Sequence, residues 1–256
     1  MPKLIEVVTH AYAKHFGFYS SALVYHLSSL VLDPPKDCRV QITVCFDPSD
    51  DLTLDVIDWF CKETVLHIHK LPLTLPYLGR RAIGRNLAAK RTEADIVWFS
   101  DVDQCFREGI LDRLAGMEWP EKAVMVFPQR IKIHRTHSIG DTTLKRVEGN
   151  PQLIDVDPED FVPKKYHVAI GGTQIVRGDF VRQNGYLDKN TRWQQPVKAN
   201  KKGIVRFDSC KCDVAYRQQV CQRHGRTVEK IDLDGLYRIR HTIATHEATD
   251  AQLASE

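Results

Sequence analysis

A buried strand that runs into an acidic turn is predicted by Ala94-Asp-Ile-Val-Trp-Phe-Ser-Asp-Val-Asp-Gln-Cys-Phe106. The continuous apolar run from Ile96 to Phe99 is typical of a strand buried on both faces. It ends at Asp101 and Asp103, whose side chains share one face if the segment stays extended, so they can converge on one ligand. Open α/β sheets bind ligands at the carboxyl ends of their strands, and two anionic oxygens there suit a divalent cation carrying phosphate. The alternative is a solvated, Asp-rich turn.

Strands and helices alternate, with short turns between them, over the first half of the chain. Strands are expected at residues 4–9, 40–46, 65–71, 96–99 and 123–127. Apolar stripes and helix-breaking residues predict helices at 18–32, through Ile57 and Phe60, at 82–91, and from Ile110 to Met117. This alternation predicts an α/β fold with a doubly wound, mostly parallel central sheet flanked by helices.

The second half is more polar and less regular. From Arg130 to Lys165 few residues are apolar, which predicts long connections over a sheet edge. A short strand is expected at 168–176 and a helix at 213–224. The basic stretch 188–202 is expected to be a lid whose Trp193 either stacks on a sugar or packs against the protein.

Composition excludes several classes of protein. The chain has 256 residues, of which 43% are hydrophobic and 27% charged, and these values are ordinary for a soluble globular protein. A net charge of +3 is too small to indicate nucleic acid binding, but it suits an anionic donor or a membrane-associated acceptor. The apolar runs are too short for a transmembrane segment and no secretory signal is visible, although peripheral membrane contact stays open. Seven cysteines without disulfide-scaffold density favour reduced thiols and a cytoplasmic location.

Two arginines precede the acidic turn on one helix. Arg81 and Arg85 lie four residues apart and therefore share a helix face. Guanidinium groups beside carboxylates and a metal are suited to bind pyrophosphate, whereas the structural alternative is a solvated basic face.

The order of these motifs resembles the family 2 glycosyltransferases of the GT-A fold. Gly79-Arg-Arg-Ala-Ile-Gly-Arg-Asn-Leu-Ala-Ala-Lys90 resembles the family's Gly/Ala-Arg-Asn helix, and the strand with its Asp-x-Asp signature follows in the family's order. The resemblance covers residues 4 to about 115. It recurs at 171–188, with Gly171-Gly-Thr-Gln and Gly185-Tyr-Leu-Asp, and at 207–217, which is similar to a catalytic helix start.

The resemblance implies a single GT-A domain over residues 1–245. Residues 1–106 would form the nucleotide-sugar-binding half, 107–245 the acceptor and catalytic half, and 246–256 a tail. It implies an inverting, metal-dependent hexosyl- or pentosyltransferase. The donor would be a nucleotide-diphosphate sugar, with a UDP-sugar favoured, and the acceptor a hydroxyl of a glycan, a lipid-linked sugar or a protein.

The same resemblance assigns roles to individual residues. Asp213 would be the catalytic base, with Asp208 as a fallback, although Cys212 stands where the family has Glu and an N-cap role for Asp213 is the alternative. The donor would be contacted by Thr9, Tyr12, Asp47, Arg81, Arg85 and Asp101. The metal would be held by Asp101, Asp103 and His241, with His246 a weaker substitute for the histidine. Imidazole with carboxylates favours Mn2+, and Mg2+ is possible.

Three other interpretations stay open. Cys210, Cys212, Cys221 and His224 could form a structural zinc site, although their spacing is not a common zinc pattern. The presence of Cys212 where the family has Glu is compatible with a catalytically silent nucleotide-sugar or carbohydrate-binding module. A nucleotidyltransferase is the third possibility, but the glycine-rich phosphate loop expected after the first strand is not visible.

Overall fold

Two β-sheets organise this computed structural model, which describes residues 1–13, 17–147, 151–198, 211–223 and 225–242. The strands are β1 (Leu4–His10), β2 (Arg39–Phe46), β3 (Ile68–Pro72), β4 (Ile96–Phe99), β5 (Gln104–Phe106), β6 (Ala123–Pro128), β7 (Arg130–His134), β8 (Phe161–Lys165), β9 (Gln174–Arg177), β10 (Thr227–Ile231) and β11 (Leu236–Arg238). The helices are α1 (Phe18–Leu32), α2 (Asp51–Glu63), α3 (Leu75–Leu78), α4 (Arg81–Arg91), α5 (Ile110–Gly116), α6 (His137–Lys145), α7 (Gly178–Asn184), α8 (Thr191–Gln194) and α9 (Cys212–Gln218).

The large sheet has the strand order β10-β6-β9-β4-β1-β2-β3. Its strands are parallel except for β9, which is antiparallel to both β4 and β6. This confirms the predicted single α/β domain with a mostly parallel central sheet. The chain adds β2 and β3 on one side of β1 and then places β4 on the other side. The carboxyl ends of β1 and β4 therefore form a topological switch point, where ligands bind in open α/β sheets.

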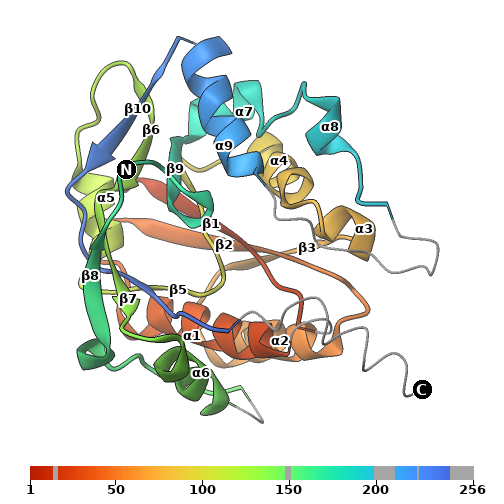
Figure 1. Cartoon of the computed structure of the whole chain (residues 1–256), viewed down its shortest axis with the longest axis vertical. Helices are drawn as coiled ribbons and strands as arrows, with labels where there is room; N and C mark the ends of the chain where they lie inside the picture. The colour runs from red at the N-terminus through yellow and green to blue at the C-terminus, as the bar shows by residue number, and fades with distance from the viewer. Residues whose placement is uncertain (14–16, 148–150, 199–210, 224, 243–256) are drawn as a thin grey trace.

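Helices cover both faces of the large sheet (Figure 1). Helices α1 and α2 lie on one side, and α4, α7 and α9 lie on the other. Helix α1 is buried along ten consecutive residues, Ser21–Leu30, because α2, α6 and β5 contact it and its apolar residues share a core cluster with β1 and β2. Its polar residues are therefore buried as well: Ser29 Oγ accepts a hydrogen bond from the Phe106 N–H at 2.9 Å, and the His26 ring lies 2.6 Å from the Gln104 carbonyl oxygen. Helix α1 thus anchors the segment that follows the acidic turn.

The burial of His26 makes stability depend on pH. Desolvation lowers the pKa of this ring to about 4 from its ordinary 6.5. Below pH 6.5 the unfolded chain binds a proton there that the folded chain does not, so the free energy of unfolding falls as the pH drops towards 4, by about 3 kcal/mol for this group. Urea unfolding at a series of pH values should show a smaller fall for His26→Gln than for the wild type. His67→Gln, at an exposed position, should show the same fall in the free energy of unfolding as the wild type.

The segment from Arg130 to Lys165 contradicts the sequence prediction. It contains β7, α6 and β8, and its strands join a small sheet of order β5-β11-β7-β8 instead of forming long connections. These strands are short, and β7, which pairs with β8, also pairs with β11 about a hundred residues further along the chain, so the local pattern does not reveal this sheet.

One further expectation needs correction, and one of the two alternatives for Trp193 is supported. The strand expected at 168–176 begins only at Gln174, because Gly171–Thr173 form a 3-10 turn. Trp193 lies in α8 and is 9% exposed, with the guanidinium groups of Arg80 and Arg192 within 5.5 Å of its ring, so it packs against the protein.

Other predictions lie outside the described residues or stay untested. The expected tail from 246 is not described, and the boundary between the two proposed halves remains a prediction. Among the described residues, no helix combines the length and the apolar character needed to cross a bilayer.

Candidate active site

Polar side chains gather at the carboxyl ends of β1, β2 and β4. Parallel pairing sets Val8 beside Phe99 and His10 beside Cys45, so these three strands end at the same edge. Thr9, Asp47 and Asp101 lie at or just beyond that edge, as expected for the end of parallel strands.

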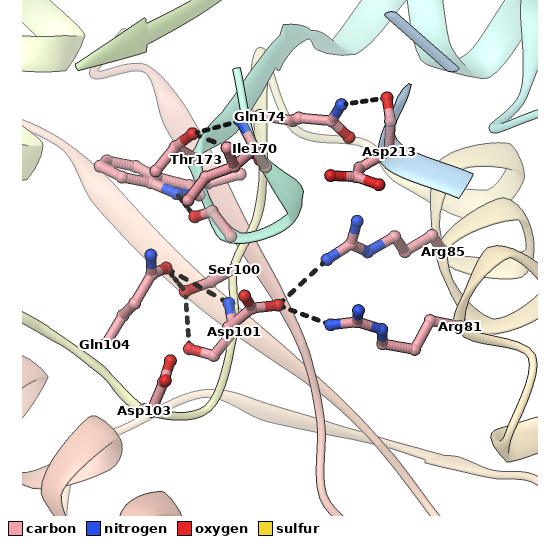
Figure 2. Close-up of polar contacts among 12 residues, drawn as sticks. Arg81, Arg85, Ser100, Asp101, Asp103, Gln104, Ile170, Thr173, Gln174 and Asp213 are labelled. Atoms are coloured by element: carbon pink, nitrogen blue, oxygen red, sulfur yellow. Dashed lines mark hydrogen bonds and ion pairs between the residues drawn. The ribbon is translucent and has the colours of Figure 1, made fainter. Parts of the chain in front are cut away.

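The acidic turn separates its two carboxylates. The Gln104 N–H donates to the Asp101 carbonyl oxygen at 3.2 Å, which closes a turn, and the Gln104 Oε1 accepts hydrogen bonds from Ser100 Oγ at 2.7 Å and from the Asp101 N–H at 3.2 Å (Figure 2). The segment is therefore not extended, so the argument that would place Asp101 and Asp103 on one face does not apply to it, and their convergence on one ligand remains a prediction. Asp101 is paired with residues of α4, whereas Asp103 is paired with residues at the end of β11.

Helix α4 presents two arginines to one carboxylate oxygen. Arg81 Nη1 lies 2.9 Å and Arg85 Nη2 3.5 Å from Asp101 Oδ1, as the four-residue spacing predicts (Figure 2). The Arg85 side chain is 1% exposed and packs within 5.7 Å of the Phe99 and Tyr186 rings, whereas that of Arg81 is 32% exposed. Arg81 can therefore contact an anion that enters from solvent, whereas the buried Arg85 holds Asp101 in place.

Asp213 approaches Asp101 across Gly171. A Cβ placed on Gly171 would lie 3.8 Å from both Asp101 carboxylate oxygens and 3.8 Å from Asp213 Oδ2. Asp213 stands in the first turn of α9. Residues separated by more than a hundred positions thus face the same small space (Figure 2).

A chain of hydrogen bonds connects the two sides of this space. Arg85 Nη1 donates to the Tyr186 hydroxyl at 3.1 Å, and that hydroxyl donates to Gln174 Oε1 at 2.9 Å. Gln174 Nε2 then donates to the Asp213 carbonyl oxygen at 2.9 Å. Sequence reasoning missed the roles of Gln174 and Tyr186, although both lie in the motifs Gly171-Gly-Thr-Gln and Gly185-Tyr-Leu-Asp.

The two glycines at this site differ in the space around them. A Cβ on Gly172 would lie 2.6 Å from Gln104 Nε2 and 2.9 Å from Asp101 Oδ2, so Gly172→Ala must displace both side chains. We expect it to lower the free energy of unfolding by about 1–3 kcal/mol. Gly171→Ala meets only ordinary contacts, so its stability should change by less than about 0.5 kcal/mol.

Activity should nevertheless fall in both variants, because the Gly171 methyl group would occupy the space between the carboxylates. Urea unfolding and turnover, measured on both variants, separate the two effects. Equal stability of the two variants would contradict the close approach at Gly172.

Asp103 is buried against two cationic or potentially cationic side chains. Arg238 Nε lies 3.0 Å and His241 Nε2 3.7 Å from Asp103 Oδ2. Burial raises the pKa of Asp103, but Arg238 and His241 more than offset this and hold it at about 2. Arg238 was not predicted as a site residue. The sequence feature that could have pointed to Arg238 is its position in Tyr237-Arg-Ile-Arg-His241, but only the fold brings this segment to Asp103.

The predicted metal ligands are only partly assembled. Among the described residues, no group of three or more His, Cys, Asp or Glu side chains is arranged to hold a metal ion. Asp103 Oδ1 is buried without a hydrogen-bond partner, and His241 Nε2 lies 3.7 Å from the other oxygen of the same carboxylate, so Asp103 and His241 fit a divalent cation as two of its ligands. Asp101 is occupied by arginines, and its metal role remains a prediction. His246 lies outside the described residues.

The predicted nucleoside contacts lie at the same sheet edge. Thr9 Oγ1 is buried without a hydrogen-bond partner, which leaves a donor and acceptor available there. Tyr12 is 5% exposed and packs edge-on against Tyr19, with 5.1 Å between ring centroids. Asp47 Oδ1 accepts two hydrogen bonds from Ser49, at 2.9 Å each, which is the turn-capping role. The nucleoside role of these residues remains a prediction.

The zinc and fallback-base alternatives fall largely outside the described residues. Asp208, Cys210 and His224 are not described, so neither alternative is decided. Cys212 is 1% exposed and belongs to the apolar cluster that contains Tyr186. Asp213 is thus the carboxylate that the described start of α9 offers to the site.

Comparison with known proteins finds similarity at the level of structure. No family model and no curated protein sequence matches the chain. The mannosyltransferase PcManGT from Pyrobaculum calidifontis, solved with GDP-Man and Mn2+, superposes with a TM-score of 0.58 at 12% identity, over 99% of this chain and 61% of that one.

Residues 1–349 of TarS from S. aureus give a TM-score of 0.55 at 15% identity, over 91% of this chain and 60% of that one. The same protein in complex with UDP gives 0.54 at 16% identity, over 91% of this chain and 59% of that one. The chain spans about three fifths of the length of these structures. Together with its strand order, these similarities show that the chain has the GT-A fold of glycosyltransferases.

Proposed function

We propose that the chain is an inverting, metal-dependent glycosyltransferase. In this proposal a sugar moves from a nucleotide-diphosphate sugar to a hydroxyl of a glycan, a lipid-linked sugar or a protein. The observation that carries it is the meeting of two different carboxylates at Gly171: Asp101 is bound by two arginines, and the Asp213 carboxylate belongs to a residue whose backbone carbonyl accepts a hydrogen bond from Gln174.

The Asp101 side of the site suits a diphosphate leaving group. Negative charge develops on the leaving diphosphate as the bond to the sugar breaks, and fixed cations stabilise it most when they are already in place. Arg81 is such a cation, since it is partly exposed and held at 2.9 Å by Asp101. Asp103 and His241 would hold a divalent cation, which supplies further positive charge to the phosphates when bound.

The Asp213 side of the site suits proton removal. A base must take the proton from the acceptor hydroxyl as this oxygen attacks the sugar. Asp213 is partly exposed in the first turn of α9, and it faces the same space as Asp101 from the other side of Gly171. A single displacement between a base on one side and a leaving group on the other inverts the sugar carbon.

The choice of donor rests on the solved structures of similar fold. One was determined with UDP and another with GDP-Man and Mn2+. A UDP-sugar with Mn2+ is our first choice, with a GDP-sugar next and Mg2+ as the alternative metal.

Thermal unfolding with a panel of nucleoside diphosphates, each with and without Mn2+, tests this proposal. A ligand that binds only the folded state raises the melting temperature, and we expect one nucleotide to do so in a metal-dependent way. Arg81→Met should weaken that nucleotide about tenfold, because it removes a charged hydrogen bond to phosphate. Arg91→Met, at the exposed far end of the same helix, is the matched control and should bind normally.

Two results would count against the proposal. Absence of a shift with every nucleotide would remove the donor site and the enzyme function with it. Binding of a nucleotide sugar without hydrolysis or transfer, across donors and acceptors, would favour the silent binding module instead.

A further inference from the structure

A pocket of about 550 Å³ lies against α8, the short helix that packs on α4 close to α3 (Figure 1). The residues assigned above to the donor, the metal and the base do not line it. Three of its polar lining residues are permanent cations, and none of its lining residues is acidic. The polar lining consists of Arg80, Thr191, Arg192, Gln195 and Lys198.

The protein does not neutralise the three cations of this pocket. In the part of the chain that the structure describes, the side chains of Arg80, Arg192 and Lys198 form no salt bridge and donate no hydrogen bond to another residue. The Arg80 Nε atom is buried and lacks an acceptor. The pocket therefore retains positive charge and hydrogen-bond donors that a ligand could use.

A pocket of similar size at the amino ends of β1 and β4 shows the contrast. It is also lined by three permanent cations, but each of them donates to a backbone carbonyl oxygen at 2.6 to 2.9 Å, and three carboxylates share the lining. The cations there are Lys3, Arg177 and Arg182, and the carboxylates are Asp95, Glu118 and Asp179. Charge is balanced in that pocket and unbalanced in the pocket at α8.

The two arginines at α8 are held in position by one indole ring. The guanidinium carbons of Arg80 and Arg192 lie 5.5 Å and 5.3 Å from the centre of the buried Trp193 ring. Helix α8 is itself fixed, because Gln194 Nε2 donates to the Tyr186 carbonyl oxygen at 2.9 Å. Two like charges beside one ring repel each other, and an anion that binds both offsets this repulsion. Groups oriented before binding also lose less conformational entropy when the ligand arrives.

The start of α4 sends its two neighbouring arginines to different places. Arg80 is the N-cap residue and has non-helical backbone angles, φ −101° and ψ 79°. It therefore leaves the helix face that Arg81 shares with Arg85, and it lies over Trp193, whereas Arg81 lies 2.9 Å from Asp101. The pocket at α8 is thus separate from the arginines assigned to the donor diphosphate.

Guanidinium groups bind phosphate through paired N–H···O hydrogen bonds, and a lining without carboxylates does not repel a dianion. We propose that the pocket at α8 binds a phosphate group carried by a ligand other than the nucleotide donor. Arg80 and Arg192 supply the guanidinium groups, and Lys198 supplies a third positive charge. This inference goes beyond the proposed function and does not depend on it.

Inorganic phosphate is the probe, titrated by calorimetry into the full chain at constant ionic strength. We expect saturable binding at one site, and Arg192→Gln should weaken it about tenfold through loss of a charged hydrogen bond. Arg39→Gln is the matched control, because Arg39 is also exposed but stands at the start of β2 and does not line the pocket. Its affinity for phosphate should equal that of the wild type. Both variants should keep the melting temperature of the wild type, since neither side chain is buried.

Three results would overturn the inference. Absence of saturable phosphate binding would remove the site. Equal weakening by Arg192→Gln and Arg39→Gln would show diffuse surface attraction. Loss of phosphate binding in the presence of UDP and Mn2+ would assign the pocket to the donor, while the proposed function stood. Phosphate binding that depends on Arg192 in a chain that does not bind UDP would support this inference and remove the proposed function.

Vesicles identify the source of the phosphate. Sedimentation with phosphatidylglycerol vesicles but not with phosphatidylcholine vesicles, dependent on Arg192 and not on Arg39, would support the site and indicate a lipid headgroup. Binding of inorganic phosphate without such sedimentation would support the site and indicate a soluble phosphate ester.

Discussion

Asp213→Asn is expected to lower turnover by about 10²- to 10⁴-fold, the contribution typical of a general base. The amide keeps the size of the side chain but cannot accept the proton of the acceptor hydroxyl. The backbone carbonyl of residue 213 still accepts the hydrogen bond from Gln174, so α9 should stay in place. Nucleotide binding and the melting temperature should therefore remain close to those of the wild type. Donor hydrolysis and transfer, measured together with nucleotide binding, separate a loss of catalysis from a loss of binding.

The control for this variant is another aspartate in the first turn of a helix. Asp179 occupies that position in α7, is exposed, and does not line the space at Gly171. Asp179→Asn removes the same favourable interaction with a helix N-terminus, which is worth about 0.3–1 kcal/mol, without removing a base. Full activity in Asp179→Asn and loss of activity in Asp213→Asn would assign the effect to chemistry. A fully active Asp213→Asn would show that another residue is the base.

Asp103→Asn should abolish the manganese dependence of nucleotide binding. This carboxylate holds a buried oxygen without a hydrogen-bond partner, and its pKa of about 2 keeps it ionised at neutral pH. Replacing it by an amide removes the anionic ligand that a divalent cation needs. The melting-temperature shift caused by nucleotide should then be the same with manganese and with a chelator.

Asp101→Asn is the informative companion to this variant. If Asp101 only holds Arg81 and Arg85 in place, its amide variant weakens nucleotide binding equally with and without metal. If Asp101 is also a ligand, manganese dependence disappears here too. A metal-dependent shift that survives in Asp103→Asn would rule out the assignment of Asp103 as a ligand.

Local patterns in the sequence were sufficient for most of the large sheet, although they did not predict β10. Strands such as β1, β2 and β4 are continuous or alternating apolar runs, and α4 carries its arginines at the spacing that puts them on one face. These features depend on residues close together in the chain, so burial and helix geometry express them directly. The mostly parallel sheet, and the common helix face of the two arginines, follow from such patterns.

Tertiary contacts decided the rest of the site. The extended-strand argument for Asp101 and Asp103 failed because Gln104 closes a turn between them, and each carboxylate then found a different partner. The small sheet escaped prediction because β5 and β11 pair across more than 120 residues.

The sequence alone therefore determined the class of fold and the identity of the carboxylates and arginines at its edge. The tertiary structure decided that Asp213 meets Asp101 at Gly171, and that Arg238 and His241 lie against Asp103. The physical reason is that strand and helix formation depends on neighbours in sequence. The site depends on which distant segments fill the same small volume once the two sheets have packed.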